Sequence, residues 1–186
     1  MLPLAITIPW IIFLVYWLVS AVKTNRATSR ESHISRYSIM LMLVAGYLFL
    51  FRSEVGFGLL GRHFLPRVPM VEMTGIALLW LGLTLAIWAR YHLGQYWSAR
   101  VTIKEGHQLI RTGPYARLRH PIYTGLVLMT AGTALAIDRW RCVLGAALTL
   151  AAYSLKARKE EAMLSQQFGE AFQEHRRHTG FLIPRL

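Results

Sequence analysis

The chain has 186 residues, which is enough for one domain at the usual size of roughly 100–200 residues. Its residues are 54% hydrophobic and 16% charged, with a mean hydropathy of +0.37, which excludes a disordered chain and is unlike a soluble domain carrying about 25% charge. The formal charge is +12, but the basic residues lie between long uncharged runs, so we expect no nucleic-acid partner. One cysteine, Cys142, excludes an internal disulfide and a cysteine-cluster metal site.

Five uncharged runs predict five membrane-spanning helices, at residues 1–22, 37–51, 73–89, 121–137 and 142–155. A spanning helix needs about 20 mostly apolar residues, within a range of about 17–25. The second and fifth runs are shorter, but basic residues flank both, and such side chains can extend to the membrane surface. We therefore expect an all-α polytopic membrane protein. It would form a single domain over 1–186, with three N-terminal helices in 1–93 and the catalytic loop, hairpin and tail in 94–186.

The last two runs predict a tight helical hairpin, because only Asp138-Arg139-Trp140-Arg141 separates them. Apolar residues recur at helical spacing from Leu155 to Phe172, so we expect the fifth helix to continue beyond the membrane as an amphipathic extension. That extension would place the chain's C-terminal tail in the same compartment as the loop that precedes the hairpin.

The basic residues predict the orientation in the membrane. Sixteen of the 21 lie in segments 23–36, 90–119 and 156–186, which alternate with segments holding the other five. Since cytoplasmic loops carry the excess of Lys and Arg, we expect the N-terminus outside and the active site and C-terminus in the cytoplasm, in a bacterial-type inner or plasma membrane. The lipid bilayer is then the first expected partner, and anionic lipid of the inner leaflet attracts the same charges.

Two further motifs are not expected to form a binding site. Residues 56–61 match the dinucleotide fingerprint GxGxxG, but no preceding strand or acidic residue about 20 positions on supports it, so we expect an interfacial loop. His175 and His178 have no third ligand at a recognised spacing, so no metal site is predicted.

Chemistry is expected in the loop before the fourth run and the tail after the fifth. Pro121 suits the first turn of a helix, and the free N–H groups there, beside Arg119 and His120, form a natural anion site. Lys156 and Glu160 are neighbours one turn apart on the fifth helix, which must return beside the fourth. Acidic and basic groups would thus converge at one mouth of the hairpin.

Five motifs in this order resemble those of one family, the integral-membrane methyltransferases typified by isoprenylcysteine carboxyl methyltransferase, with phospholipid N-methyltransferases as distant relatives. The resemblance covers roughly residues 97–184. Its motifs are His107-Gln108-Leu109-Ile110, Gly113-Pro114-Tyr115, Arg119-His120-Pro121-Ile122-Tyr123-Thr124-Gly125, Glu160-Glu161-Ala162-Met163-Leu164 and Phe168-Gly169.

The resemblance implies S-adenosyl-L-methionine as methyl donor. We expect an apolar slot for its adenine at Leu109, Ile110 and Tyr115, the helix start and His120 for its carboxylate, and Glu160 for its ammonium. The full set expected to bind the cofactor is Arg100, His107, Gln108, Leu109, Ile110, Tyr115, Arg119, His120, Pro121, Ile122, Tyr123 and Glu160.

Two positions depart from the family pattern. Arg100 stands where the eukaryotic enzymes have glutamine, and Lys156 stands where the family has a substrate-facing arginine one helical turn before the glutamate pair. A lysine cannot reproduce the bidentate grip of arginine on a carboxylate, so either Arg158 or the charge of the membrane surface is expected to share that role.

The function expected from the resemblance is methylation of a lipophilic substrate at the membrane–cytoplasm interface, with a prenylcysteine-like carboxylate as the leading acceptor. The expected catalytic residues are Lys156 and Arg158, which would hold that carboxylate, and Glu161, which would serve as base for an amine acceptor. The alternatives are N-methylation of a phospholipid amine, S-methylation of a small thiol, and a non-catalytic lipid-binding protein.

Overall fold

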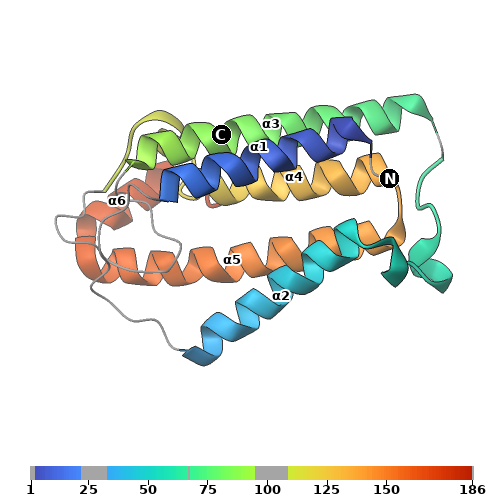
Figure 1. The fold of residues 1–186 in the computed structure, drawn as a ribbon. Helices are drawn as coiled ribbons and strands as arrows, with labels where there is room; N and C mark the ends of the chain where they lie inside the picture. The colour runs from blue at the N-terminus through green and yellow to red at the C-terminus, as the bar shows by residue number, and fades with distance from the viewer. Residues whose placement is uncertain (1–2, 22–32, 67, 95–108, 186) are drawn as a thin grey trace.

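The computed structural model describes residues 3–21, 33–66, 68–94 and 109–185, and these ranges contain helices and no strands. The α-helices of the described residues are α1 (Leu4–Ala21), α2 (His33–Phe51), α3 (Pro69–Leu93), α4 (Pro121–Ile137), α5 (Trp140–Phe168) and α6 (Glu170–His178). Short 3₁₀ helices η1 (Ser53–Val55), η2 (Gly58–Gly61) and η4 (Gly113–Ala116) lie between them. Figure 1 shows α1, α3, α4 and α5 running back and forth along roughly one direction, with α2 inclined to them and α6 at one end.

The hairpin is as predicted. α4 fills 121–137 with Pro121 in its first turn and ends at Asp138, whose φ of 52° turns the chain in the left-handed region. α5 begins at Trp140 and continues to Phe168, which confirms that the last helix runs on past residue 155. Gly169, with φ of 50°, ends it, and α6 follows directly.

The all-helical class is confirmed, while five membrane spans remain a prediction. Among the described helices, only α3, with 25 residues, has both the length and the hydropathy to cross a membrane. Shorter apolar segments lie at residues 4–20, 36–51 and 121–137. The fingerprint-like residues 56–61 follow helix α2 and not a strand, so their structure differs from that of a dinucleotide loop.

Glycines bring α3 and α4 into backbone contact. A Cβ on Gly82 would stand 2.5 Å from the carbonyl oxygen of Gly125, and a Cβ on Gly132 would stand 2.5 Å from the backbone nitrogen of Leu79. Small residues at such positions allow apolar helices to approach closely, which favours association inside a membrane. α3 and α4 therefore form one tightly packed pair.

A second pair is formed by α2 and α5. A Cβ on Gly145 would stand 2.6 Å from the carbonyl oxygen of Gly46, and the hydroxyl of Thr149 donates a hydrogen bond of 3.1 Å to Thr130 of α4. α1 packs mainly on α3, and Trp10 Nε1 of α1 donates a hydrogen bond of 3.0 Å to Thr133 Oγ1 of α4. These contacts hold both pairs and α1 in one bundle.

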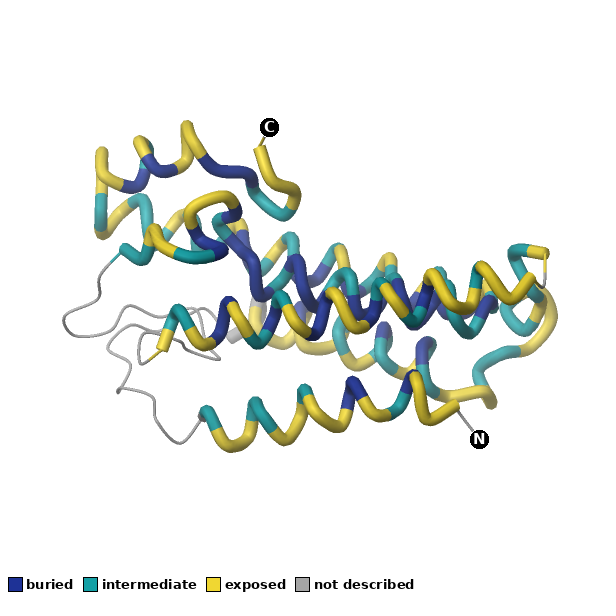
Figure 2. Tube along the Cα trace, turned by 90° about the horizontal axis from the view of Figure 1, so that it is seen from above, coloured by how far each residue is buried: buried dark blue, intermediate teal, exposed yellow. Residues whose placement is uncertain are grey.

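The outward faces of the helices are apolar. Figure 2 shows α1, which begins at the end labelled N, as largely exposed; Leu14, Leu18 and Val19 are 56%, 72% and 68% exposed. Soluble proteins rarely present contiguous apolar surface of this kind, whereas a bilayer covers it. Cys142 is fully buried at the start of α5, as expected of a small buried hydrophobe.

The helix ends that adjoin the basic segments lie together at one end of the bundle. The end of α1, the start of α2, the end of α3, the start of α4 and helix α6 all lie at one end of the bundle in Figure 1. The basic segments 23–36, 90–119 and 156–186 adjoin or include these helix ends, so the described parts are consistent with one strongly basic end.

Candidate functional site

Two consecutive glutamates of α5 face an arginine and a histidine at the start of α4. Arg119 Nε donates a hydrogen bond of 2.5 Å to Glu161 Oε1, and His120 Nε2 lies 3.3 Å from the same oxygen. On its other side, His120 Nδ1 lies 3.6 Å from Glu160 Oε2. Tyr123 donates from its hydroxyl to Glu160 Oε1. These five residues, called the charged cluster below, confirm that acidic and basic groups converge at the mouth of the hairpin.

The charges in the cluster stabilise one another. Burial by itself lowers the pKa of His120, but hydrogen bonds and charges from Glu160 and Glu161 outweigh it and leave that pKa raised. Burial by itself raises the pKa of Glu161, but His120 and Arg119 outweigh it and leave that pKa lowered. Each shift favours the ionised form of its group, so a His120 imidazolium faces the Glu161 carboxylate between pH 4.5 and 6.5, the ordinary pKa values of the two groups.

The sequence at the helix start explains how Arg119 and His120 come to face α5. Pro121 has no N–H to leave unpaired in the first turn, and its ring fixes the helical φ. The carbonyl of His120 accepts the first helical hydrogen bond, 3.0 Å from the N–H of Thr124. His120 is therefore the last residue before the helix, with a non-helical backbone (φ −126°, ψ 56°), and is 5% exposed.

Residues 179–182, here called the C-terminal strap, run beside the chain that leads into α4. The carbonyl of Gly180 accepts a hydrogen bond of 2.9 Å from the N–H of Arg119, and the carbonyl of Phe181 accepts one of 3.3 Å from the N–H of His120. The strap thus fixes the backbone from which both cationic side chains project.

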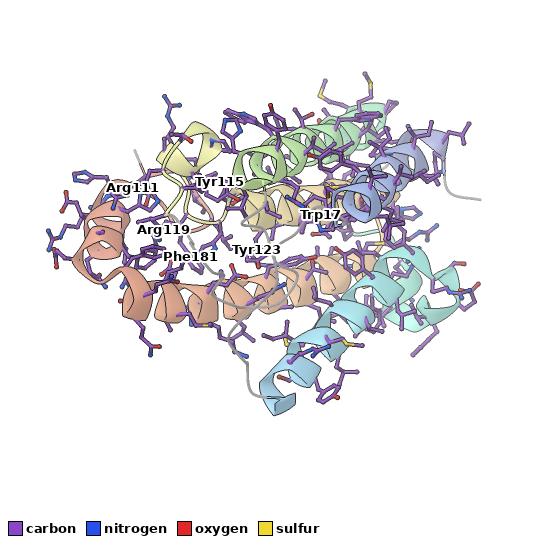
Figure 3. All side chains as sticks on the ribbon, turned by 60° about the vertical axis from the view of Figure 1, so that its left-hand side comes forward. Trp17, Arg111, Tyr115, Arg119, Tyr123 and Phe181 are labelled. Carbon is purple, nitrogen blue, oxygen red and sulfur yellow. The ribbon has the colours of Figure 1, made fainter. Side chains whose placement is uncertain are left out.

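The strap also contacts those side chains. The ring of Phe181 stands edge-on to His120, with centroids 5.3 Å apart, and the guanidinium carbon of Arg119 lies 5.8 Å from the Phe181 centroid. Arg119 Nη1 donates to the carbonyl of Thr179. Figure 3 shows Arg119 and Phe181 close together beside α5. Sequence reasoning missed the strap, whose one visible signal was an apolar run at residues 181–184 in an otherwise polar tail.

Stacked aromatic rings lead from the charged cluster into the bundle. His120 and Tyr123 are nearly parallel, with centroids 5.7 Å apart, and Tyr123 stacks on Tyr153 of α5 at 5.4 Å. The hydroxyl of Tyr153 is 2.9 Å from that of Tyr47 in α2. This row of rings joins the cluster to the interior without a break.

A groove of about 510 Å³, called the aromatic groove below, opens along this row. Its walls come from α1, α2, α4 and α5, and Trp17 of α1 marks one side of it in Figure 3. Most of its lining is aromatic or aliphatic: Trp10, Phe13, Trp17, Tyr47, Phe51, Ile122, Tyr123 and Tyr153. Lys156 is its cation, with Nζ 5.5 Å from the centroid of the Tyr123 ring. An apolar chain with an anionic head fits such a groove.

The three residues expected to form the adenine slot all lie within the described part of the chain. Tyr115, in η4, is buried, and its pKa is raised by burial and then by the nearby charge of Glu160. Leu109 and Ile110 are half-buried, and Ile110 packs against the core. Tyr115 therefore lies near the charged cluster, and an apolar surface adjoins it.

The remaining predicted site residues fall into three groups. Pro121 and Ile122 are buried at the start of α4, and Ile122 lines the aromatic groove. Arg158 is exposed on α5, two residues from Lys156, and thus points about 200° around the helix from it. The structure does not bring it to the groove. Three further residues, Arg100, His107 and Gln108, lie outside the described residues.

The two histidines of α6 occupy different surroundings. His178 is exposed, with Nε2 2.7 Å from Glu174 Oε1, while His175 is buried and its pKa is lowered by burial and by neighbouring arginines. Within the described ranges no group of three or more His, Cys, Asp or Glu residues converges in a way that suits a metal ion.

Comparison with known proteins places this arrangement in a family. Residues 75–166 match the model of the isoprenylcysteine carboxyl methyltransferase (ICMT) family. A protein-S-isoprenylcysteine O-methyltransferase of Schizosaccharomyces pombe is 30% identical over 116 residues, covering 61% of this chain and 49% of that protein. A nickel-cobalt-cadmium resistance protein, NccN, of Alcaligenes xylosoxydans xylosoxydans is 34% identical over 113 residues, covering 57% of this chain and 48% of that protein. The chain thus spans about half the length of these relatives.

A solved structure shares the fold. The eukaryotic intramembrane Ras methyltransferase ICMT superposes with a TM-score of 0.64 and 23% sequence identity, over 94% of this chain and 62% of that chain. The helical bundle described above is therefore the ICMT fold.

Proposed function

Because the chain belongs to the ICMT-like family of membrane proteins, we propose that it is an S-adenosylmethionine-dependent methyltransferase acting on a lipophilic substrate at the membrane–cytoplasm interface. The proposed reaction is O-methylation of a prenylcysteine-like carboxylate, on a small molecule or a prenylated protein. One observation carries the proposal: the charged cluster and the aromatic groove share Tyr123, so one substrate can have an apolar chain in the groove and a polar group at the cluster.

The residues of the cluster suit the proposed cofactor. Its ammonium group fits Glu160, whose carboxylate is 24% exposed and is bound by the neutral hydroxyl of Tyr123. Its adenine fits the apolar surface beside Tyr115, and its carboxylate fits the basic start of α4. When bound, the cofactor supplies a methyl group on a positively charged sulfur.

Lys156 is the residue proposed to orient the acceptor. Its ammonium lies over Tyr123 at the lip of the aromatic groove, one helical turn before Glu160. A carboxylate held there is already ionised and needs no base. The chain's contribution to the rate is then positioning and exclusion of water, and positioning alone is worth up to about 7–11 kcal/mol in well-oriented systems.

The surroundings of Glu161 favour a carboxylate over an amine as acceptor. N-methylation of a protonated amine requires a base, and Glu161 is the candidate. Its carboxylate is bound by Arg119 and His120 and its pKa is lowered, which makes it a weak base. We therefore place phospholipid amines second.

The direct test is transfer of a labelled methyl group by the detergent-purified full chain to a farnesylcysteine analogue, with phosphatidylethanolamine and a small aliphatic thiol as competing acceptors. We expect base-labile label on the farnesylcysteine analogue, because a methyl ester hydrolyses in base. Base-stable label on either competitor would identify that competitor as the acceptor in place of the proposed one.

A second measurement separates a methyltransferase from a lipid-binding protein. It is the binding of S-adenosylhomocysteine, measured by calorimetry. The absence of binding would overturn the proposal that this chain is a methyltransferase.

Variants test the assignment of Glu160. Glu160→Gln keeps an acceptor for the Tyr123 hydroxyl but removes the charge, and we expect it to weaken binding of S-adenosylhomocysteine about 10-fold or more, as expected for loss of a charged hydrogen bond. The matched control is Glu174→Gln on the exposed face of α6, which should bind as the natural chain does. Equal binding by both variants would remove Glu160 from the cofactor site.

A further inference from the structure

A second cavity lies at the end of the bundle opposite the charged cluster. Its volume is about 460 Å³, within the size range of small-ligand sites, roughly 300–1,000 Å³. Pro3 and Ile6 of the N-terminal segment, Ala136 and Ile137 of α4, and two arginines, Arg139 and Arg141, are among its lining residues. Figure 1 shows this end, where α4 turns into α5 near the N-terminus. Nothing in the proposed methyl transfer uses it.

Arg141 is a buried cation held only by neutral groups. It is 6% exposed, and its Nη1 donates hydrogen bonds of 2.6 and 2.8 Å to the carbonyls of Phe49 and Leu50 at the end of α2. Among the described residues no carboxylate pairs with it, and these bonds leave Nε and Nη2 as further donors. Burying a charge without an opposite one is costly, so this arrangement favours an anion in the adjoining cavity.

Arg139 brings a second positive charge to the same cavity. Its Nη1 donates a hydrogen bond of 2.5 Å to the carbonyl of Gly61, again a neutral acceptor. Two guanidinium groups, each fixed by backbone carbonyls, thus meet at one cavity. Planar guanidinium groups fixed in this way suit the oxygen atoms of a phosphate, which two of them can bind together.

Asp138, which directly precedes Arg139 in the chain, is bound by other groups. Asp138 Oδ2 is 2.7 Å from His63 Nδ1, and its Oδ1 accepts hydrogen bonds from the N–H groups of Phe64 and Leu65 at 3.2 and 2.9 Å. Glu54, the other acidic residue of this loop region, is exposed. The two arginines therefore keep an unbalanced charge beside the cavity.

We propose that this cavity binds the phosphate group of an anionic ligand through Arg139 and Arg141. The apolar wall formed by Ile6, Ala136 and Ile137 adjoins the two guanidinium groups, so a phosphodiester with an apolar continuation, such as a lipid headgroup, uses more of the cavity than a free phosphate ion does. The site lies apart from the charged cluster and does not depend on the proposed methyl transfer.

The experiment is native mass spectrometry of the delipidated full chain titrated with short-chain phosphatidylglycerol, phosphatidylcholine or inorganic phosphate. We expect one retained phosphatidylglycerol, and about 10-fold weaker retention in Arg139→Gln, because a hydrogen bond to a charged group is lost. Arg141→Lys keeps the charge but loses the planar fork, and should also weaken retention. Arg52→Gln is the matched control: it removes the same charge from an exposed position at the same end.

The outcomes separate the possible ligands. Saturable binding of inorganic phosphate that requires both arginines identifies a free anion as ligand and supports the site. Retention of phosphatidylglycerol and not phosphate identifies the lipid. Equal loss in Arg52→Gln and Arg139→Gln would reduce the effect to surface charge, and no retention of any anion, or equal retention of phosphatidylcholine, would overturn the proposal.

Discussion

Glu160 and Glu161 are adjacent in the chain but have different surroundings. Consecutive residues of a helix point about 100° apart, so the Glu161 carboxylate meets Arg119 and one side of His120, while the Glu160 carboxylate meets the Tyr123 hydroxyl and the other side of His120. The side chain of Glu161 is 12% exposed, and that of Glu160 is 24% exposed. Glu161 thus holds the start of α4 against α5, and Glu160 is the more exposed carboxylate, which is why we propose it for the cationic group of the cofactor.

The paired charges predict how stability depends on pH. The pKa of His120 is raised in the folded chain, so its contribution is present below its ordinary value of 6.5 and is lost as pH rises through the folded pKa. The pKa of Glu161 is lowered, so its contribution is present above its ordinary value of 4.5 and is lost as pH falls through the folded pKa. Both groups therefore stabilise the fold most fully between pH 4.5 and 6.5.

Thermal unfolding of the purified chain across pH 3–9 checks this expectation. Glu161→Gln should lower the unfolding temperature between pH 4.5 and 6.5. It should also weaken the loss of stability on both the acidic and the basic side of this range, since it removes the Glu161 carboxylate and thereby one partner of His120. An unchanged pH profile in this variant would contradict the coupling. Glu174→Gln, at an exposed ion pair on α6, should leave the profile close to that of the natural chain.

At the scale of helices, the backbone contact between α3 and α4 predicts sensitivity to one methyl group. Gly82→Ala would place a Cβ 2.5 Å from the Gly125 oxygen and 2.7 Å from the Met129 nitrogen, so the helices must separate. We expect a loss of about 1–3 kcal/mol in the free energy of unfolding in detergent. Leu81→Ala, on the exposed face one residue away, is the control and should cost much less.

The strap predicts loss of binding without loss of the helices. A Cβ on Gly180 would overlap the carbonyl oxygen of Ile183, at 1.7 Å, so Gly180→Ala must displace the strap from Arg119 and His120. We expect faster hydrogen exchange at those two amides and weaker binding of S-adenosylhomocysteine, with unchanged helical circular dichroism. Ile183→Ala, at a side chain 79% exposed, should behave as the natural chain does; equal exchange in both variants would contradict the role of the strap.

The helix limits could largely be predicted, and the reason is chemical. Pro121 and Asp138 bound α4 on both sides, so its range follows from the residues alone. α3 extends beyond the uncharged run, because Glu72 and Arg90 lie within its first and last turns. The strap could not be predicted, since its bonds to the α4 start use backbone groups that every residue except proline carries.

At the scale of the whole molecule, the predicted orientation can be measured with its single cysteine. Cys142 is buried, and Cys142→Ala gives a background without thiols. In that background we expect Leu59→Cys, in the loop after α2, to react with a membrane-impermeant maleimide in intact cells. Arg177→Cys, on the exposed face of α6, should react only after permeabilisation. The reverse pattern would contradict the orientation.

The site itself was partly visible in the sequence. Convergence of the basic loop with Glu160 and Glu161 follows from a hairpin whose two helices must return side by side. The aromatic groove could not be predicted in the same way, because Trp10, Tyr47 and Tyr153 come from three different helices. The pairing of these helices depends on glycine contacts, which a hydropathy pattern does not reveal. The groove rings therefore look, in the sequence, like ordinary membrane-facing aromatics.

The continuous helix α5 fixes the distance between Lys156 and Glu160 along its axis. Lys156 is the first charged residue after the apolar part of this helix, and Glu160 follows four residues later, which is about 6 Å further along a rigid axis at 1.5 Å per residue. No hinge separates the two within the helix. For the proposed methyl transfer, we therefore expect a preference for acceptors whose reactive group lies about one helical turn beyond the end of their apolar tail.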